Sequence, residues 1–190
     1  MQAARGTSLS DAEAPGPTRP TGRRRGRCLL LFAGVAVAAY AVDLLSKLWA
    51  VSHLSDGHDV RVVGDLLVLH LTRNPGAAFS TGTEYTVLLS CLAVAAALVV
   101  VYLSRRVGSL LWALALGLLL AGICGNLTDR LFREPGPLHG HVIDFLMLPH
   151  WPVFNVADMC INVAAALILV QAFRGVRISG APTDDRRKTA

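Results

Sequence analysis

Two aspartates in the C-terminal half of the sequence could together catalyse a hydrolysis. Asp144 lies between the apolar residues Ile143 and Phe145, and Asp158 follows the segment FNVA at 154–157. Two carboxylates that meet in a low-dielectric site do not both ionise easily, so they tend to share a proton. One can then activate water while the other polarises a carbonyl, as in aspartic proteases. The spacing leaves open the alternative that each acid faces a polar cavity alone.

Other charged and amide residues stand near the ends of apolar segments, where they are costly. A charged side chain inside the hydrocarbon costs roughly 2.5–3.5 kcal/mol, which makes each one a functional candidate. Asp43 and Lys47 are four residues apart and can pair on one helix face. We interpret them as an ion pair that neutralises its own charges and anchors the helix end, in preference to a catalytic role. Asn126, Asp129 and Arg130 crowd another helix end. Helix capping and snorkelling could explain Arg130 alone, but not all three.

Motifs for other chemistries are absent from the sequence. It contains no HExxH, GxSxG or P-loop pattern, and its four cysteines stand far apart in apolar segments. Isolated cysteines of this kind are typical of small buried hydrophobes. His139 and His141 alternate in a loop and are a weak indication of metal binding. We therefore expect no metal site.

The elements that must position these residues are membrane helices. The 190 residues are 53% hydrophobic and only 16% charged, whereas soluble domains are about 25% charged. This composition excludes an ordinary soluble globule and a wholly disordered chain. Four segments approach the roughly 20 apolar residues that span a bilayer. We predict an all-α membrane domain over 28–173, with four transmembrane helices at about 29–50, 85–103, 109–127 and 153–173. The first is too long for a signal-peptide core, and no cleavage site follows it.

The basic residues are distributed unevenly along the chain. The polar tail 1–27, the turn 104–108 and the tail 174–190 hold thirteen of the eighteen Lys and Arg residues. The positive-inside rule places both tails and the turn in the cytoplasm. The composition of residues 1–27 also predicts disorder. The net charge of +5 is thus interpreted as a signal of topology and of attraction to anionic membrane lipids. It does not indicate nucleic-acid binding.

The loop 52–84 on the opposite side has a pattern of its own. Residues 60–71 are rich in Val and Leu around a Gly-Asp pair, which predicts a short β-hairpin at the membrane surface. The segment NPGAAF at 74–79 predicts a turn followed by small residues. These small residues would leave a groove through which acyl chains could enter from the lipid.

Taken together, the motifs resemble those of the bacterial lipoprotein signal peptidase family (signal peptidase II). The resemblance covers about 29–173 and shows no departure at a functional position; only the long N-terminal tail is unusual. Five motifs in the family's order on a four-helix frame are specific. They are Asp43-x-x-x-Lys47, Asn74-x-Gly76-Ala77-Ala78-Phe79, Gly125-Asn126-x-x-Asp129-Arg130, Val142-x-Asp144-Phe145 and Phe154-Asn155-x-Ala157-Asp158.

The resemblance implies an intramembrane aspartyl endopeptidase of the bacterial cytoplasmic membrane, without metal or cofactor. It would cut the signal peptide from prolipoproteins just before the diacylglyceryl-modified cysteine, with Asp144 and Asp158 as the catalytic dyad. An extracytoplasmic β segment would clamp the lipidated substrate, globomycin-type antibiotics would block the site, and a monomer would suffice. The implied supporting residues are Asp43, Lys47, Asn74, Gly76, Asn126, Asp129, Arg130, Asn155 and Ala157.

Two other functions are compatible with four membrane helices. A binding or transport subunit would carry ionisable residues through the whole depth of the membrane, but here they gather near one face. A structural scaffold would leave Asp144 and Asp158 unexplained. The sequence therefore favours a peptidase.

Overall fold

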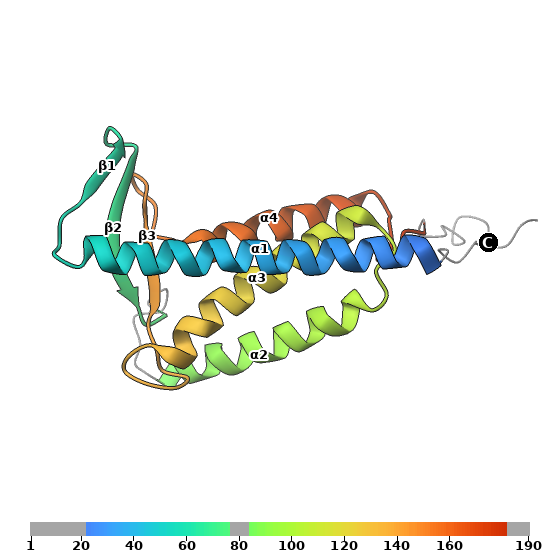
Figure 1. Cartoon of the computed structure of the whole chain (residues 1–190), viewed down its shortest axis with the longest axis horizontal. Helices are drawn as coiled ribbons and strands as arrows, with labels where there is room; N and C mark the ends of the chain where they lie inside the picture. The colour runs from blue at the N-terminus through green and yellow to red at the C-terminus, as the bar shows by residue number, and fades with distance from the viewer. Residues whose placement is uncertain (1–21, 77–83, 182–190) are drawn as a thin grey trace, which may run out of the picture.

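The computed structural model describes residues 22–76 and 84–181. Four helices run side by side, and a small sheet lies across one end of the bundle (Figure 1). All four helices are long and apolar enough to cross a membrane, in agreement with the predicted fold class. In chain order the elements are α1 (Gly22–Leu54), β1 (Val60–Val63), β2 (Leu67–Asn74), α2 (Glu84–Ser104), α3 (Leu110–Phe132), β3 (Val142–Met147) and α4 (Val156–Phe173).

Two helix starts differ from the sequence prediction. α1 begins at Gly22, so residues 22–27 of the predicted disordered tail are helical; their arginines are good helix formers, and the helix continues directly into the apolar segment. The remainder of that tail lies outside the described residues. α4 begins at Val156 instead of residue 153, because Asn155 caps its first turn.

Helix α3 is the centre of the bundle and contacts the other three helices. Three glycines on it allow this close approach. A Cβ at Gly117 would lie 2.8 Å from a backbone oxygen of α1, and one at Gly122 would lie 2.5 Å from a backbone oxygen of α4. A Cβ at Gly125 would meet Asp43 of α1 and Ala157 of α4. In lipid, where no hydrophobic effect drives helices together, small residues at the interface permit the close packing.

The predicted hairpin is confirmed, and a third strand that the sequence did not predict joins it. β1 and β2 are antiparallel around a turn in which Gly64 has a φ of +50°. β3 pairs with β2 in the order β1-β2-β3, with Thr72 opposite Asp144 and Asn74 opposite Val142. This pairing places the end of β2 beside the first candidate aspartate.

Successive side chains of β3 point to opposite faces of the sheet and so contact different neighbours. Ile143 and Phe145 pack with Ala50 and Leu54 of α1 in one buried cluster. Because side chains alternate across a strand, Asp144 faces the other side of the sheet. The sheet is thus fastened to α1 through the neighbours of the aspartate, which restricts where the aspartate can lie.

The other end of the bundle carries the N-terminus of α1, the α2–α3 turn and the segment after α4. We call residues 22–27, 104–110 and 174–181 the basic end. Here Gly108 N donates to Ile178 O at 2.9 Å, and Trp112 Nε1 donates to Val176 O at 2.9 Å. The first eight residues of the predicted C-terminal tail are therefore folded against the bundle, and residues 182–190 lie outside the described residues.

Candidate active site

The two candidate aspartates lie at the sheet end of the bundle and share one neighbour, Asn155. Its side-chain Nδ2 donates to Asp144 Oδ1 at 2.6 Å. Its backbone N donates to Asp158 Oδ2 at 3.1 Å. Asn155 is fully buried, so one rigid residue connects β3 and α4 and holds a carboxylate on each side.

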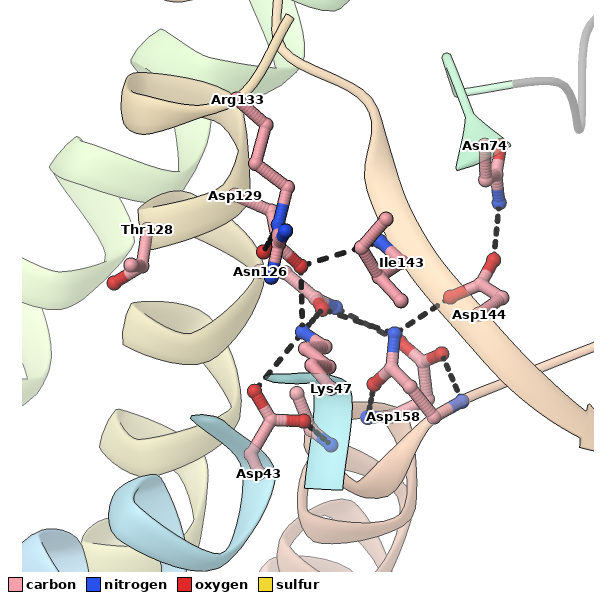
Figure 2. Close-up of polar contacts among 12 residues, drawn as sticks. Asp43, Lys47, Asn74, Asn126, Thr128, Asp129, Arg133, Ile143, Asp144 and Asp158 are labelled. Atoms are coloured by element: carbon pink, nitrogen blue, oxygen red, sulfur yellow. Dashed lines mark hydrogen bonds and ion pairs between the residues drawn. The ribbon is translucent and has the colours of Figure 1, made fainter. Parts of the chain in front are cut away.

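Asp158 occupies the first turn of α4. Its backbone N donates to Asn155 Oδ1 at 2.9 Å, so the two residues form a reciprocal capping box. Its Oδ1 accepts a hydrogen bond from Asn126 Nδ2 of α3 at 2.9 Å (Figure 2). The positive end of a helix dipole stabilises a carboxylate in this position. Asp158 therefore both caps α4 and accepts a hydrogen bond from α3.

Asp144 is more deeply enclosed, with 2% of its surface exposed. Its Oδ2 accepts a hydrogen bond from Asn74 Nδ2 at 2.8 Å (Figure 2). The pKa of Asp144 is raised to about 6: burial raises it most and the charge of Asp158 adds to this, while the hydrogen bonds from Asn74 and Asn155 oppose the rise. Burial disfavours the charged form of a carboxyl group. Asp144 is thus the member of the pair that more readily holds a proton.

A buried cation lies behind the pair. Lys47 is fully buried, and its Nζ is 2.9 Å from Asp43 Oδ2 and 2.9 Å from Asp129 Oδ2. The same Nζ donates to Asn126 Oδ1 at 3.0 Å (Figure 2). The predicted pair of Asp43 and Lys47 therefore forms, but it does not stand alone: it extends to α3 and reaches the amide that contacts Asp158.

The two carboxylates bound to Lys47 also hold backbone groups of the elements that carry the aspartate pair. Asp43 Oδ1 accepts from Ala157 N at the start of α4, at 2.7 Å. Asp129 Oδ2 accepts from Ile143 N of β3 at 3.2 Å, and its Oδ1 accepts from Arg133 Nε. Arg133 was missed by the sequence analysis, although its spacing of four from Asp129 would have indicated a pair. The network fixes α4 and β3 relative to each other.

Arg130 completes the charged groups around the pair. It is half-buried, and its Nη1 is buried with no hydrogen-bond partner among the described residues. Its positive charge acts on Asp144, Asp158 and Asp129. A buried guanidinium N–H without a partner is costly, so this atom is available to bind an acceptor that enters the site.

Gly76 orients Asn74. Its backbone N donates to Asn74 Oδ1 at 2.8 Å, which leaves the Nδ2 of that amide facing Asp144. Gly76 has a φ of +104°, a conformation that residues with a Cβ rarely adopt. The turn predicted from the sequence therefore supports the site. The small residues Ala77 and Ala78 lie outside the described residues.

The predicted site residues thus converge on one end of the bundle, while the histidines do not form a metal site. Among residues 22–76 and 84–181, no three His, Cys, Asp or Glu side chains are grouped so that they could hold a metal ion. His139 Nδ1 instead lies 3.0 Å from Pro137 O.

A pair of acids that can share a proton, here one on β3 and one in the first turn of α4, is the arrangement found in aspartic peptidases. A family model described as "Signal peptidase (SPase) II" matches residues 35–174. Since this match covers most of the sequence, the chain belongs to the signal peptidase II family.

Known relatives agree with this assignment. The lipoprotein signal peptidase of Rhodococcus jostii is 44% identical over 170 residues, covering 90% of this chain and 84% of its own. That of Mycobacterium tuberculosis strain H37Rv is 44% identical over 170 residues, covering 89% and 83%. A solved structure titled as a bacterial membrane enzyme, 24% identical, has the same fold: its TM-score is 0.67, with 78% of this chain and 94% of that one covered.

Proposed function

We propose that this chain removes signal peptides from prolipoproteins by cleaving before the diacylglyceryl-modified cysteine, with Asp144 and Asp158 activating water. Its relatives of 44% identity are named for lipoprotein substrates. The observation that carries the catalytic assignment is the bridge through Asn155, which bonds both carboxylates at 2.6 and 3.1 Å. Two acids held on one buried residue can share a proton in the way that aspartic peptidases require.

The charges around the pair support a single shared proton. Four carboxylates and three cations make up the site: Asp43, Asp129, Asp144, Asp158, Lys47, Arg130 and Arg133. One proton on the pair therefore brings the cluster to neutrality, the state that costs least in a low-dielectric environment. Asp144, whose pKa lies near 6, holds that proton, and Asp158 is the base.

Hydrolysis then needs only these two acids and water. Asp158 takes a proton from water as the water oxygen bonds to the scissile carbonyl carbon, and Asp144 gives its proton to the carbonyl oxygen. When the tetrahedral diol collapses, the C–N bond breaks and Asp158 returns its proton to the leaving nitrogen. Asp144 regains a proton from the diol. The free Nη1 of Arg130 is placed to stabilise negative charge near the pair.

The substrate reaches the site from the membrane and water reaches it from outside. The positive-inside rule places the basic end, with both termini, in the cytoplasm of a bacterial cell and the sheet end on the extracytoplasmic side. Trp151, which is 64% exposed at the sheet end, suits a membrane–water interface. A signal-peptide helix and its diacylglyceryl group would enter sideways, with the scissile bond at the level of the pair.

A transport path fits the charge distribution poorly. The sequence has no Asp, Glu, Lys or Arg in 28–42, 85–104, 110–128 or 159–173. These segments include the half of the bundle nearer the basic end and, in α2 and α3, extend almost the whole length of the helix. An ion path would need polar groups along that half as well.

A cleavage assay on the purified chain in detergent tests the proposal. The substrate is a diacylglycerylated prolipoprotein, with the unmodified form beside it, and cleavage is followed by gel shift. We expect Asp144→Asn and Asp158→Asn each to lower the rate at least about 1,000-fold. Asp65→Asn is the control, because that aspartate is 87% exposed on the hairpin. Cleavage that survives either dyad substitution would remove the aspartyl mechanism. A globomycin-type inhibitor, which would occupy the same site, should abolish cleavage.

A further inference from the structure

A cavity at the basic end has no part in the peptidase chemistry. It measures about 330 Å³ and is lined by Arg23, Arg24, Arg27 and Leu110. Three arginines of α1 therefore line this space together with one apolar residue at the start of α3. This combination suits a ligand with an anionic head and an apolar body.

No acid of the same region neutralises these arginines. The described residues of the basic end include eight arginines but no Asp or Glu. The first acid along α1 is Asp43, sixteen residues after Arg27, or about 24 Å at 1.5 Å per residue. Within the described residues, the positive field at the cavity is therefore not balanced by any nearby carboxylate.

The cavity walls are held in place by contacts within the basic end. The Arg25 guanidinium donates to the backbone oxygen of Arg105 in the α2–α3 turn. That turn is in turn fixed by the hydrogen bond from Gly108 N to Ile178 O. The N-terminal ends of α1 and α3 both point here, and their dipoles add positive potential to that of the side chains.

The cavity lies at the height where lipid headgroups would be. α1 has 33 residues, about 50 Å of helix, whereas the hydrocarbon core is about 30 Å thick. The arginines are followed at once by the apolar residues 28–33. Leu30 is 76% exposed and Leu110 is 54% exposed, so acyl chains could pack directly below the guanidinium groups.

From this geometry we infer that the cavity is a binding site for the phosphate headgroup of an anionic phospholipid. The phosphate would accept charge-assisted hydrogen bonds from Arg23, Arg24 and Arg27, while one acyl chain would lie against Leu110. Such a lipid would help to set the depth of α1, and with it the depth of the whole bundle, in the membrane.

Lipid titration of the full chain in non-ionic detergent tests this site. Binding of dioctanoyl phosphatidylglycerol is measured by thermophoresis, with dioctanoyl phosphatidylcholine and inorganic phosphate as comparison ligands. A basic residue near an anionic surface contributes about 1 kcal/mol, so the triple variant R23Q/R24Q/R27Q should bind phosphatidylglycerol roughly 100-fold more weakly. The matched control is R106Q/R174Q/R177Q, which removes three exposed arginines of the same end that do not line the cavity. It should weaken binding only a few fold.

Each alternative to a specific anionic-lipid site predicts a different result in this titration. Equal loss in the two triple variants would mean a diffuse positive field and no site. Equal binding of phosphatidylcholine would mean an acyl-chain groove, and binding of inorganic phosphate as tight as that of the lipid would mean a free-anion site. Tighter lipid binding by D11N/E13Q would mean that the acids of the N-terminal segment occupy the cavity. Prolipoprotein cleavage, which depends on the opposite end, should persist in both triple variants and shows that they are folded.

Discussion

Lys47 Nζ donates to Asn126 Oδ1 at 3.0 Å, and this bond determines which way the Asn126 amide faces. An ammonium group has donors only, so it must meet the amide oxygen. The amide Nδ2 is thereby turned to Asp158 Oδ1, at 2.9 Å. The buried cation thus does more than neutralise Asp43 and Asp129: it orients a hydrogen-bond donor toward the proposed catalytic pair.

Replacing Lys47 with Met should therefore lower both stability and activity. The substitution leaves Asp43 without a cation in a buried site, and loss of one partner of a buried ion pair costs about 3–5 kcal/mol. We expect a lower midpoint in thermal unfolding and a reduced kcat. In the double variant D43N/K47M the unpaired charge is gone, so part of the lost stability should return. A double variant no more stable than K47M would contradict this account.

Asn155 both caps α4 and donates a hydrogen bond to Asp144, and two substitutions can separate these roles. Asn155→Ala removes the N-cap of α4 and the donor to Asp144, so it should cost about 1 kcal/mol of stability as well as activity. Asn155→Ser retains a capping oxygen but has no amide N–H for Asp144. We expect it to unfold near the wild-type temperature while kcat falls at least about tenfold. Full activity of Asn155→Ser would show that the residue is only a cap.

Elements and contacts formed by residues close together in the sequence could be predicted, whereas contacts between residues far apart in the sequence could not. The four spans and the hairpin follow from hydrophobic patterning, and the pair of Asp43 and Lys47 follows from a spacing of four. β3 was missed because its short apolar run lacks a clear period. Its pairing with β2 joins Asn74 to Asp144 across 70 residues, which no local signal reports.

The start of α4 shows a second limit. Hydropathy alone placed the helix start at 153, because Val153 and Phe154 are apolar. The backbone there instead bridges to β3, with Leu146 opposite Phe154, and the helix begins only after Asn155. The bridging role of Asn155 depends on this junction and so was not predictable from composition.

Gly125 should tolerate no side chain. A Cβ there would meet a carboxylate oxygen of Asp43 and lie 3.1 Å from the Cβ of Ala157. Gly125→Ala should therefore separate α3 from α1 and α4, at a cost of about 1–3 kcal/mol, and lower kcat. Gly34→Ala is the matched control in α1, where a Cβ would meet nothing within 4 Å. It should be neutral or stabilising in thermal unfolding, and an equal loss in both variants would contradict the packing argument.

Asp144 should make the folded protein less stable as the pH rises. The folded state holds this proton up to a pKa of about 6, whereas the ordinary value is 3.8. Between those values the folded state binds more protons than the unfolded state, so the free energy of unfolding falls by up to about 3 kcal/mol. Asp144→Asn lacks this titration. As the pH rises from 4 to 7, thermal unfolding should therefore show the variant gaining stability relative to wild type. If the difference in stability between the two proteins does not change with pH, Asp144 does not have the raised pKa.

Asn74 should set the upper pH limit of catalysis. Its hydrogen bond lowers the pKa of Asp144 because it stabilises the charged form. Asn74→Ala removes that bond, so the pKa of Asp144 should rise. Since the reaction needs a proton on the pair, the alkaline limb of kcat/KM, which reports the free enzyme, should move to higher pH even as the maximum rate falls. Asp158, Lys47 and Arg130, the charged groups that act on Asp144, are unchanged in this variant.

A histidine could also titrate near pH 6, so the same profile needs a control. His141 is half-buried just before β3, and His141→Gln removes its titration without altering the donors to Asp144. We expect the alkaline limb of this variant to coincide with that of wild type. If the limb instead moves in His141→Gln and stays fixed in Asn74→Ala, the proton that limits catalysis belongs to the histidine. A shift in Asn74→Ala alone assigns it to the aspartate pair, whose apparent pKa values belong to both acids together.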